Sequence, residues 1–270
     1  MAAPPTSPPV CLTVAGLDPS GGAGIAADLR AFARRRVYGA CVITAVTVQN
    51  TTGVFAVRPL PAALIERQLE AVFADLAPAA VKVGMVANPA IVAAIARTLR
   101  RLPELPPVVV DPVVAASAGG ALAKAGTVEA LVDQLLPLAA VVTPNLGEAR
   151  LLGAALHGPG ARRWPPERLA RALAALGPAV AITGLREGGE VLDLFYERGR
   201  ALLLRAPAVE PASGHGSGCT YSAALAAGLA AGERRVAAAR AAQRLAARAI
   251  ANRLAVGRGE GPVDPFGIGR

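Results

Sequence analysis

One short segment of the chain combines glycines with a residue that can react. It runs Ser213-Gly-His-Gly-Ser-Gly-Cys219 and leads into an Ala/Leu-rich tract at 223–231. Glycines let backbone approach a bound group closely, and the first N–H groups of a helix attract anions. The segment therefore predicts an anion-binding loop with a thiol, Cys219, at its mouth. A glycine-rich loop with a purely structural role is the alternative, which the rest of the chain must decide.

The elements that would position this loop follow a regular pattern. Short apolar, β-branched runs alternate with longer helical patterns, which is typical of a mostly parallel sheet with helices on both faces. Strands are expected at 10–15, 40–48, 81–83, 108–110, 140–143 and 179–183, and helices at 23–35, 61–76, 89–101, 126–136, 165–176, 218–231 and 233–255. Segments 191–197 and 201–205 predict an antiparallel hairpin near one sheet edge.

Several of these strands end in glycine or polar residues. The strand ends are Gly16-Leu-Asp18, Gln49-Asn50, Gly84-Met85, Asp111-Pro112, Thr143-Pro-Asn145 and Thr183-Gly184. In open α/β sheets, ligands bind outside the carboxyl ends of the strands. We therefore expect these ends to line one crevice that faces the 214–219 loop.

Length and composition suit one domain. With 270 residues, 53% of them hydrophobic, the chain suits a single α/β domain at 10–270, because single cores stop growing near roughly 250–300 residues. The Pro-rich residues 1–9 lack the features of a secretory signal and predict a flexible tail and a cytoplasmic protein. Cysteines 11, 41 and 219 are too widely spaced to predict a disulfide framework or a zinc site.

Two features raise other classes of protein. The uncharged run at 37–57 is long enough to test as a membrane span, but its polar residues 49–53 predict two strands and a loop instead. The net charge of +9 raises the question of whether the protein binds nucleic acid. The arginines recur at helical spacing, however, as on solvated helix faces, and aromatic residues for base stacking are few. We therefore expect no membrane and no nucleic acid among the partners, with a basic nucleic-acid-binding module as the alternative.

Two common nucleotide-binding motifs are absent or incomplete in this chain. The chain lacks the G-x-x-x-x-G-K-[ST] string of P-loop enzymes. Gly22-Ala-Gly24-Ile-Ala-Ala27 does match the relaxed dinucleotide motif G-x-G-x-x-A. That motif needs an acidic residue about 20 positions further on, and no Asp or Glu lies between Asp28 and Glu66. The sequence therefore disfavours an NAD or FAD enzyme.

Six motifs in order complete the sequence evidence. They are AGLDPSGGAGIAAD at 15–28, TAVTVQNTTG at 44–53, KVGM at 82–85, DPV at 111–113, TPNLGE at 143–148 and HGSGC at 215–219. Together they closely resemble the hydroxymethylpyrimidine/phosphomethylpyrimidine kinases of thiamin synthesis, in the ribokinase-like superfamily. The resemblance implies a three-layer fold, a homodimer, and phosphorylation by ATP and Mg²⁺ of 4-amino-5-hydroxymethyl-2-methylpyrimidine and then its monophosphate. A pyridoxal-type vitamin kinase is the nearest alternative.

The resemblance also implies roles for the anion-binding loop. Backbone N–H groups of Gly216, Ser217, Gly218 and Cys219 would hold the transferring γ-phosphoryl group. Cys219 would accept the proton of the substrate hydroxyl. A free thiol titrates near about 8.5, and we expect the helix N-terminus to lower that pKa. The alternative for Cys219 is an inert core cysteine, and His215 either tunes the thiol or caps the loop backbone.

Other positions that match the family would bind the phosphate acceptor, which is the pyrimidine alcohol. Gln49 offers an amide that complements the edge of an aminopyrimidine, and at the matching family position a glutamine binds the ring. Asp28 would assist, although an acid near a helix start is often only a dipole partner. Gly16, Met85 and Val113 would lie around the ring, with core packing as the alternative for the two apolar side chains.

The nucleotide side completes the expected site. Asn145 and Glu148 match an N-x-x-E arrangement that organises Mg²⁺ and phosphate in the superfamily, and Asp111 is a second candidate near the metal. Glu148 as a plain helix N-terminal charge is the alternative. Thr183 and Gly184 would contact the nucleotide. The chain departs from the family where lysines are usual, reading Thr183-Gly-Leu-Arg186 and Ala116-Ser-Ala-Gly119, which puts nucleotide affinity and the second phosphorylation in doubt.

Overall fold

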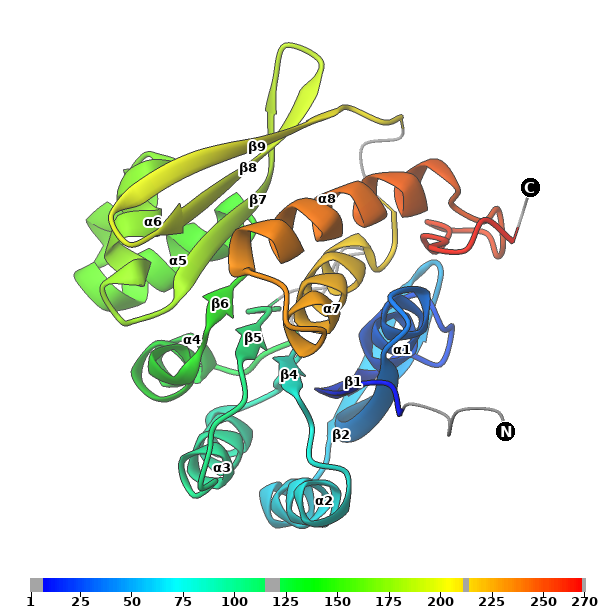
Figure 1. The fold of residues 1–270 in the computed structure, drawn as a ribbon, viewed down its shortest axis with the longest axis vertical. Coiled ribbons are helices and arrows are strands. Elements are labelled where there is room, and N and C mark those ends of the chain that lie inside the picture. The colour runs from blue at the N-terminus through cyan, green and yellow to red at the C-terminus, as the bar shows by residue number, and fades with distance from the viewer. Residues whose placement is uncertain (1–6, 115–121, 211–213, 269–270) are drawn as a thin grey trace, which may run out of the picture.

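A single sheet forms the centre of the computed structural model (Figure 1). Within residues 7–114, 122–210 and 214–268, which the structure describes, nine strands pair in the order β3-β2-β1-β4-β5-β6-β7-β8-β9. The strands are β1 (Val10–Leu17), β2 (Tyr38–Asn50), β3 (Gly53–Pro59), β4 (Ala80–Val83), β5 (Val108–Val110), β6 (Val141–Val142), β7 (Ala179–Glu187), β8 (Glu190–Glu197) and β9 (Arg200–Pro207).

The centre of this sheet is parallel and both of its edges are antiparallel. Strands β1, β2 and β4 to β7 pair in parallel, whereas β3 pairs antiparallel with β2, and β7, β8 and β9 pair antiparallel in turn. The predicted fold class is confirmed, and so are the β8–β9 hairpin and the two strands expected within 37–57. Strand β7 runs beyond the predicted Thr183 because it resumes pairing with β8 after a register shift.

Helices cover both faces of the sheet (Figure 1). One face carries α1 (Gly24–Arg34), α7 (Ser217–Ala230) and α8 (Arg235–Ala251). The other face carries α2 (Ala62–Asp75), α3 (Pro89–Arg100), α4 (Thr127–Ala130), α5 (Leu146–His157) and α6 (Pro166–Ala174). Two hydrophobic cores result, one on each face.

Alternation along the buried strands explains the two cores. In β5, Val108 and Val110 join the core under α2 to α6, while Val109 joins the core under α1, α7 and α8. Successive side chains of a strand point to opposite faces, so a strand covered on both faces is apolar throughout. The tract 223–227 of α7 is buried and almost entirely alanine. These small side chains let α7 lie close to the sheet.

Two helical predictions need correction. Of the helix expected at 126–136, only Thr127–Ala130 form an α-helix, α4. A π-helix at Leu131–Leu135 and a 3₁₀ turn at Leu136–Leu138 follow it. Pro137 lacks the amide that a continuing α-helix would require. Helix α5 was not predicted, although Asn145 and Glu148 form a capping box at its start, a pattern that marks helix N-termini in sequence.

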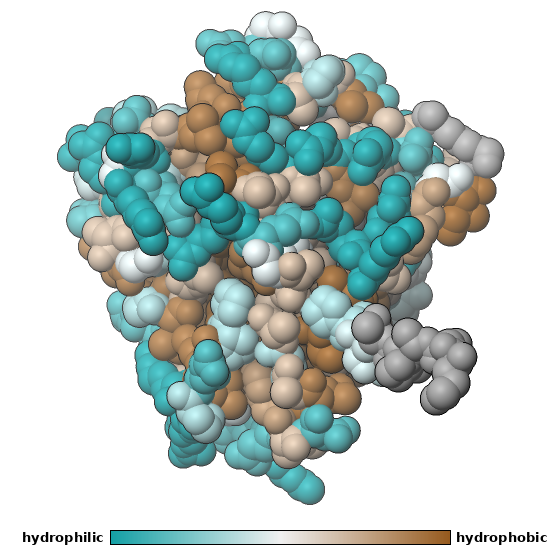
Figure 2. All heavy atoms as spheres, in the orientation of Figure 1, coloured by the Kyte–Doolittle hydropathy of each residue, from teal (hydrophilic) through white to brown (hydrophobic). Residues whose placement is uncertain are grey.

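The exposed face of α8 accounts for part of the positive charge. Arg240, Arg244 and Arg248 recur every four residues and are exposed, while the intervening face of the helix is buried. Hydrophilic side chains accordingly follow the line of α8 across the surface in Figure 2. Across the described part of the chain, no helix is both long and apolar enough to span a bilayer. Residues 1–6 of the proposed tail lie outside the described residues.

Candidate active site

A cavity of about 1370 Å³ lies where the carboxyl ends of the strands meet the start of α7. Ligand pockets usually enclose about 300–1,000 Å³, so this cavity has room for two ligands. Most of the residues expected at the site line it: Gly16, Gln49, Met85, Asp111, Val113, Asn145, Glu148, Thr183, Gly184, Gly216, Ser217, Gly218 and Cys219. The predicted crevice therefore exists, and it faces the 214–219 loop.

Asp28 is the exception among the expected site residues. Its side chain is fully buried in α1, where the two carboxylate oxygens accept hydrogen bonds from Lys82 Nζ at 3.0 and 2.9 Å. Thr13 Oγ1 donates to Oδ2 at 2.6 Å. The carboxylate is thus saturated by protein donors behind the cavity wall. The structure contradicts a direct contact between Asp28 and the substrate.

Lys82 is a buried cation that the sequence reasoning missed. Its ammonium pairs with Asp28 at 2.9 Å and lies 3.9 Å from Asp111 Oδ2, with the side chain fully buried. Burial would lower the pKa of Lys82, but the negative charge of Asp28, joined at high pH by the Cys219 thiolate, and that of Asp111 outweigh it and raise that pKa. Lys82 therefore stays charged beside the candidate catalytic groups. The KVGM motif was a signal for the position but gave no hint of this role.

Gly216, in the anion-binding loop, is the N-cap residue of α7. Gly216 has φ of 85°, and a Cβ there would overlap the carbonyl oxygen of Gly22, so only glycine fits. The Ser217 amide donates to the Gly214 carbonyl at 3.0 Å, which removes it from the predicted phosphate cradle. The amides of Gly218 and Cys219 lie in the first helical turn, where intrahelical acceptors are missing. They are the amides that suit an anion in the cavity.

The environment of Cys219 opposes ionisation of the thiol. Burial raises its pKa to about 12, and the negative charges of Asp28 and Asp111 add to this, although Lys82 and the Gly24 amide act in the opposite direction. The predicted lowering of this pKa by the helix N-terminus is wrong for the protein without ligands. Burial of the sulfur outweighs the charge of Lys82 and the hydrogen bond from the Gly24 amide, so the thiol is neutral at pH 7.

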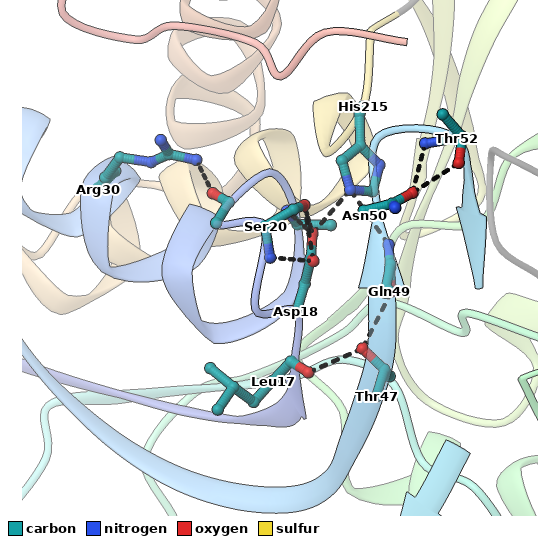
Figure 3. A network of polar contacts seen from close by, with 11 residues as sticks. Leu17, Asp18, Ser20, Arg30, Thr47, Gln49, Asn50, Thr52 and His215 are labelled. Carbon is teal, nitrogen blue, oxygen red and sulfur yellow. Dashed lines mark hydrogen bonds and ion pairs between the residues drawn. The ribbon is translucent and has the colours of Figure 1, made fainter. Parts of the chain in front are cut away.

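A polar cluster closes one end of the cavity (Figure 3). His215 Nε2 lies 2.7 Å from Asp18 Oδ2 and 3.2 Å from Gln49 Nε2. Burial favours a neutral Asp18, but hydrogen bonds from His215, Ser20 and the Ala23 amide outweigh it and lower the pKa of Asp18 to about 2. His215 therefore orients the Gln49 end of the cavity, where its side-chain partners are Asp18 and Gln49. Asp18 was expected to line the crevice as part of a strand end, and it does, but the sequence reasoning gave it no role in the site.

Two carboxylates face the cavity near its centre. Asp111 Oδ2 accepts a hydrogen bond from Ser222 Oγ at 2.8 Å. Glu148 Oε2 accepts from the Asn145 amide at 2.9 Å, and Asn145 Oδ1 accepts from the Glu148 amide at 2.9 Å. Glu148 is therefore a helix N-terminal residue, as one alternative expected, and it also lines the cavity, where the other alternative placed it. Burial and the charge of Asp111 raise the pKa of Glu148 to about 8.

This carboxylate pair fits a divalent cation. No group of three or more His, Cys, Asp or Glu in the described residues could enclose a metal ion. Mg²⁺, however, usually binds through one or two carboxylates, several waters and the substrate phosphates. Mutual repulsion that raises the pKa of Glu148 would be relieved by such a cation. Asp111 and Glu148 are therefore the residues that suit Mg²⁺.

The opposite end of the cavity lies along β7 and β8. Gly184, with φ of 73°, donates its amide to Asp193 Oδ1 at 3.0 Å. Burial raises the pKa of Asp193 to about 6 despite hydrogen bonds from Gly184 and Gln243. Arg186, in the stretch 183–186 that lacks the family's usual lysine, lines this end, and its Nη1 lies 3.9 Å from Glu210 Oε1. The second departure, at 116–119, lies outside the described residues. Asp193 was missed because it sits within an apolar strand.

Comparisons with known proteins agree with this geometry. The family described as phosphomethylpyrimidine kinase matches residues 18–264. A hydroxymethylpyrimidine/phosphomethylpyrimidine kinase of Rhizobium meliloti is 46% identical, over 95% of this chain and 97% of the relative. Among solved structures, a pyridoxal kinase from Staphylococcus aureus in complex with ADP is 32% identical with a TM-score of 0.86, covering 98% of this chain and 96% of that one. A phosphomethylpyrimidine kinase from Clostridium difficile is 37% identical with a TM-score of 0.72, covering 90% and 97%.

Proposed function

This chain belongs to the phosphomethylpyrimidine kinase family, and on that premise we propose that it phosphorylates hydroxymethylpyrimidine and then its monophosphate with ATP, in thiamin biosynthesis. The observation that carries the proposal is the layout of the cavity. Cys219 and the amides at the start of α7 lie between a polar end around Gln49 and an end along β7 and β8. An acceptor in the first end and ATP in the second would meet at Cys219.

The chain's residues suit the electrostatic demands of phosphoryl transfer. Catalysis of this reaction is mostly positioning and stabilisation of charge. The amides of Gly218 and Cys219 would hold oxygens of the γ-phosphoryl group at the positive end of α7. Asn145, Thr183 and Gly184 would contact the nucleotide. Mg²⁺ held by Asp111 and Glu148 would neutralise charge on the phosphates.

Acceptor recognition and proton transfer complete the mechanism. Gln49 would bind the edge of the aminopyrimidine, with Gly16, Met85 and Val113 around the ring. The acceptor oxygen attacks the γ-phosphorus, the bond from that phosphorus to ADP breaks, and the hydroxyl proton passes to the Cys219 thiolate. Lys82 favours that thiolate, because its charge lowers the pKa of Cys219 against the effect of burial.

The test is an ATP-dependent assay on hydroxymethylpyrimidine with the mono- and diphosphate products resolved. We expect both products from the wild-type protein. Gly218→Val should lose turnover by about 10²-fold or more while keeping its melting temperature, since a Cβ at Gly218 meets nothing within 4 Å. Absence of pyrimidine phosphorylation would refute the proposal, and full activity of Gly218→Val would remove the amides from the mechanism.

Pyridoxal is the second candidate substrate. The pyridoxal kinases of known structure reach TM-scores of 0.84 to 0.86 with this chain, and pyridoxal also carries a hydroxymethyl group. The same assay run with pyridoxal compares kcat/KM for the two acceptors. A higher kcat/KM for pyridoxal would reassign the acceptor within the same fold.

We also propose that residues 10–270 act as one kinase domain in a cytoplasmic homodimer. The three cysteines, all within the described residues, are free, as is usual in a reducing compartment. Val48 and Phe55 on the β2–β3 edge expose 55% and 65% of their surface. Apolar side chains gathered in this way often mark a subunit contact.

A further inference from the structure

The C-terminal segment 254–264, here called the strap, lies against Thr51, in the turn after Gln49, and against the backbone of His215. It leaves α8, folds back on itself through the Leu254 amide and the Pro262 carbonyl at 3.0 Å, and returns to α8 through the Asp264 amide and the Ala249 carbonyl at 3.0 Å. In Figure 1 this red segment lies beside the tip of the β2–β3 hairpin. Residues 261–264 are buried, whereas 255–259 are exposed, so the returning half of the strap is packed into the structure.

The strap holds the turn that follows Gln49. The Glu260 amide donates to the Thr51 carbonyl at 3.0 Å, and the Gly259 amide donates to Thr51 Oγ1 at 3.2 Å. A Cβ at Gly259 would overlap the carbonyl oxygen of Thr51. The strap therefore approaches this turn too closely for any residue but glycine at that position.

The same segment holds the backbone of His215. The His215 amide donates to the Gly261 carbonyl at 3.3 Å, and the Val263 amide donates to the His215 carbonyl at 3.1 Å. His215 and Gln49 lie 3.2 Å apart through their side chains. The strap therefore holds the His215 backbone and also Thr51, which lies two residues after Gln49, through its neighbouring residues 259–263.

We propose that the strap positions the acceptor end of the cavity by fixing the Gln49 turn relative to His215. The proposal rests on the proposed function, in which Gln49 binds the pyrimidine. The hydrogen bonds from the strap towards the cavity reach Thr51 and His215, both at the acceptor end. Disturbing the strap should therefore weaken acceptor binding and spare the binding of ATP.

The test compares Thr51→Val with Thr51→Ser. Valine removes the hydroxyl that accepts from the Gly259 amide, whereas serine keeps it. We expect Thr51→Val to raise KM for hydroxymethylpyrimidine and its calorimetric Kd by about tenfold, because small misplacements in a site carry large costs. KM for ATP should stay within about twofold, and Thr51→Ser should resemble the wild type.

A glycine pair gives a second, steric version of the test. Gly259→Ala should reproduce the acceptor defect more strongly, and Gly53→Ala, in the same hairpin with nothing within 4 Å of its Cβ position, should have no effect. Unchanged acceptor affinity in Thr51→Val, or equal losses for acceptor and ATP, would overturn the role of the strap. Turnover of the wild type separates the two proposals, since its absence with the pyrimidine counts against the proposed function itself.

Discussion

At the scale of single residues, burial raises the pKa of two groups that line the cavity. Cys219 and Glu148 both have a raised pKa, and both face a region that gains negative charge when ATP binds. Groups with strongly shifted pKa values often mark functional sites. The pH dependence of rate and of stability therefore reports on each of them separately.

The rate should rise with pH in the wild type. With a pKa of about 12, the thiolate fraction of Cys219 grows about tenfold per pH unit between pH 7 and 9. If the thiolate accepts the proton, kcat/KM, which reports on the free enzyme, rises with the thiolate fraction. Cys219→Asp should give a flat profile in that range, because its carboxylate is already ionised, and Cys219→Ser should lose activity throughout. A flat wild-type profile with chemistry rate-limiting would make the thiol a bystander.

Glu148→Gln should stabilise the free protein at alkaline pH. The folded pKa of Glu148, about 8, exceeds its unfolded value of 4.5. As pH rises between these values, the unfolded chain loses a proton that the folded chain keeps, so the free energy of unfolding falls. Glutamine avoids this loss and keeps the capping box.

Thermal melts without nucleotide or metal check this sign. The melting temperature of Glu148→Gln should exceed that of the wild type at pH 9, and the gain should shrink towards pH 5. Glu167→Gln, at an exposed first-turn position of α6, serves as the control and should show no such trend. A gain that is equal at both pH values would contradict the assignment.

At the scale of elements, β4 and α1 are joined through a buried ion pair rather than through apolar packing alone. Lys82 of β4 and Asp28 of α1 both have fully buried side chains. Removing one partner of such a pair leaves the other charge buried and unpaired, which is costly, whereas replacing both is much less so. The pair therefore fixes how α1 docks beside the cavity.

Urea unfolding of Lys82→Met should show a loss of about 3–5 kcal/mol. Adding Asp28→Leu should recover part of that loss. Arg97→Met removes the exposed pair in which Arg97 Nε donates to Glu66 at 2.8 Å, and it should cost less than about 1 kcal/mol. A Lys82→Met variant as stable as Arg97→Met would mean that the buried pair contributes nothing.

At the scale of the whole molecule, the sequence predicted the layered fold and the strand ends that line the cavity, because periodicity and glycine or polar strand ends are local signals. It failed where long-range burial decides. Asp28 was expected in the site, yet Lys82, 54 residues away, holds it out of reach. The pKa of Cys219 depends on the desolvation of a sulfur by several elements, which no local pattern reports.

The proposed homodimer can be tested at the same scale. Phe55→Glu places a charge on the exposed β2–β3 edge, where burial against a second copy would become unfavourable. Light scattering should give the mass of two chains for the wild type and of one chain, near 27.1 kDa, for the variant. Leu203→Glu, at an exposed apolar position on β9, is the control and should keep the wild-type mass. A monomeric wild type would refute the dimer.

The antiparallel pairing at both margins of the sheet has a consequence for how such enzymes diversify. Gln49 belongs to the β2–β3 margin, whereas Gly184 and Asp193 belong to the β7–β9 margin, with the parallel strands between them. Substitutions at one margin can change which alcohol is accepted without touching the residues proposed to bind the nucleotide. One fold can thereby phosphorylate the precursors of more than one vitamin while the phosphate donor stays the same.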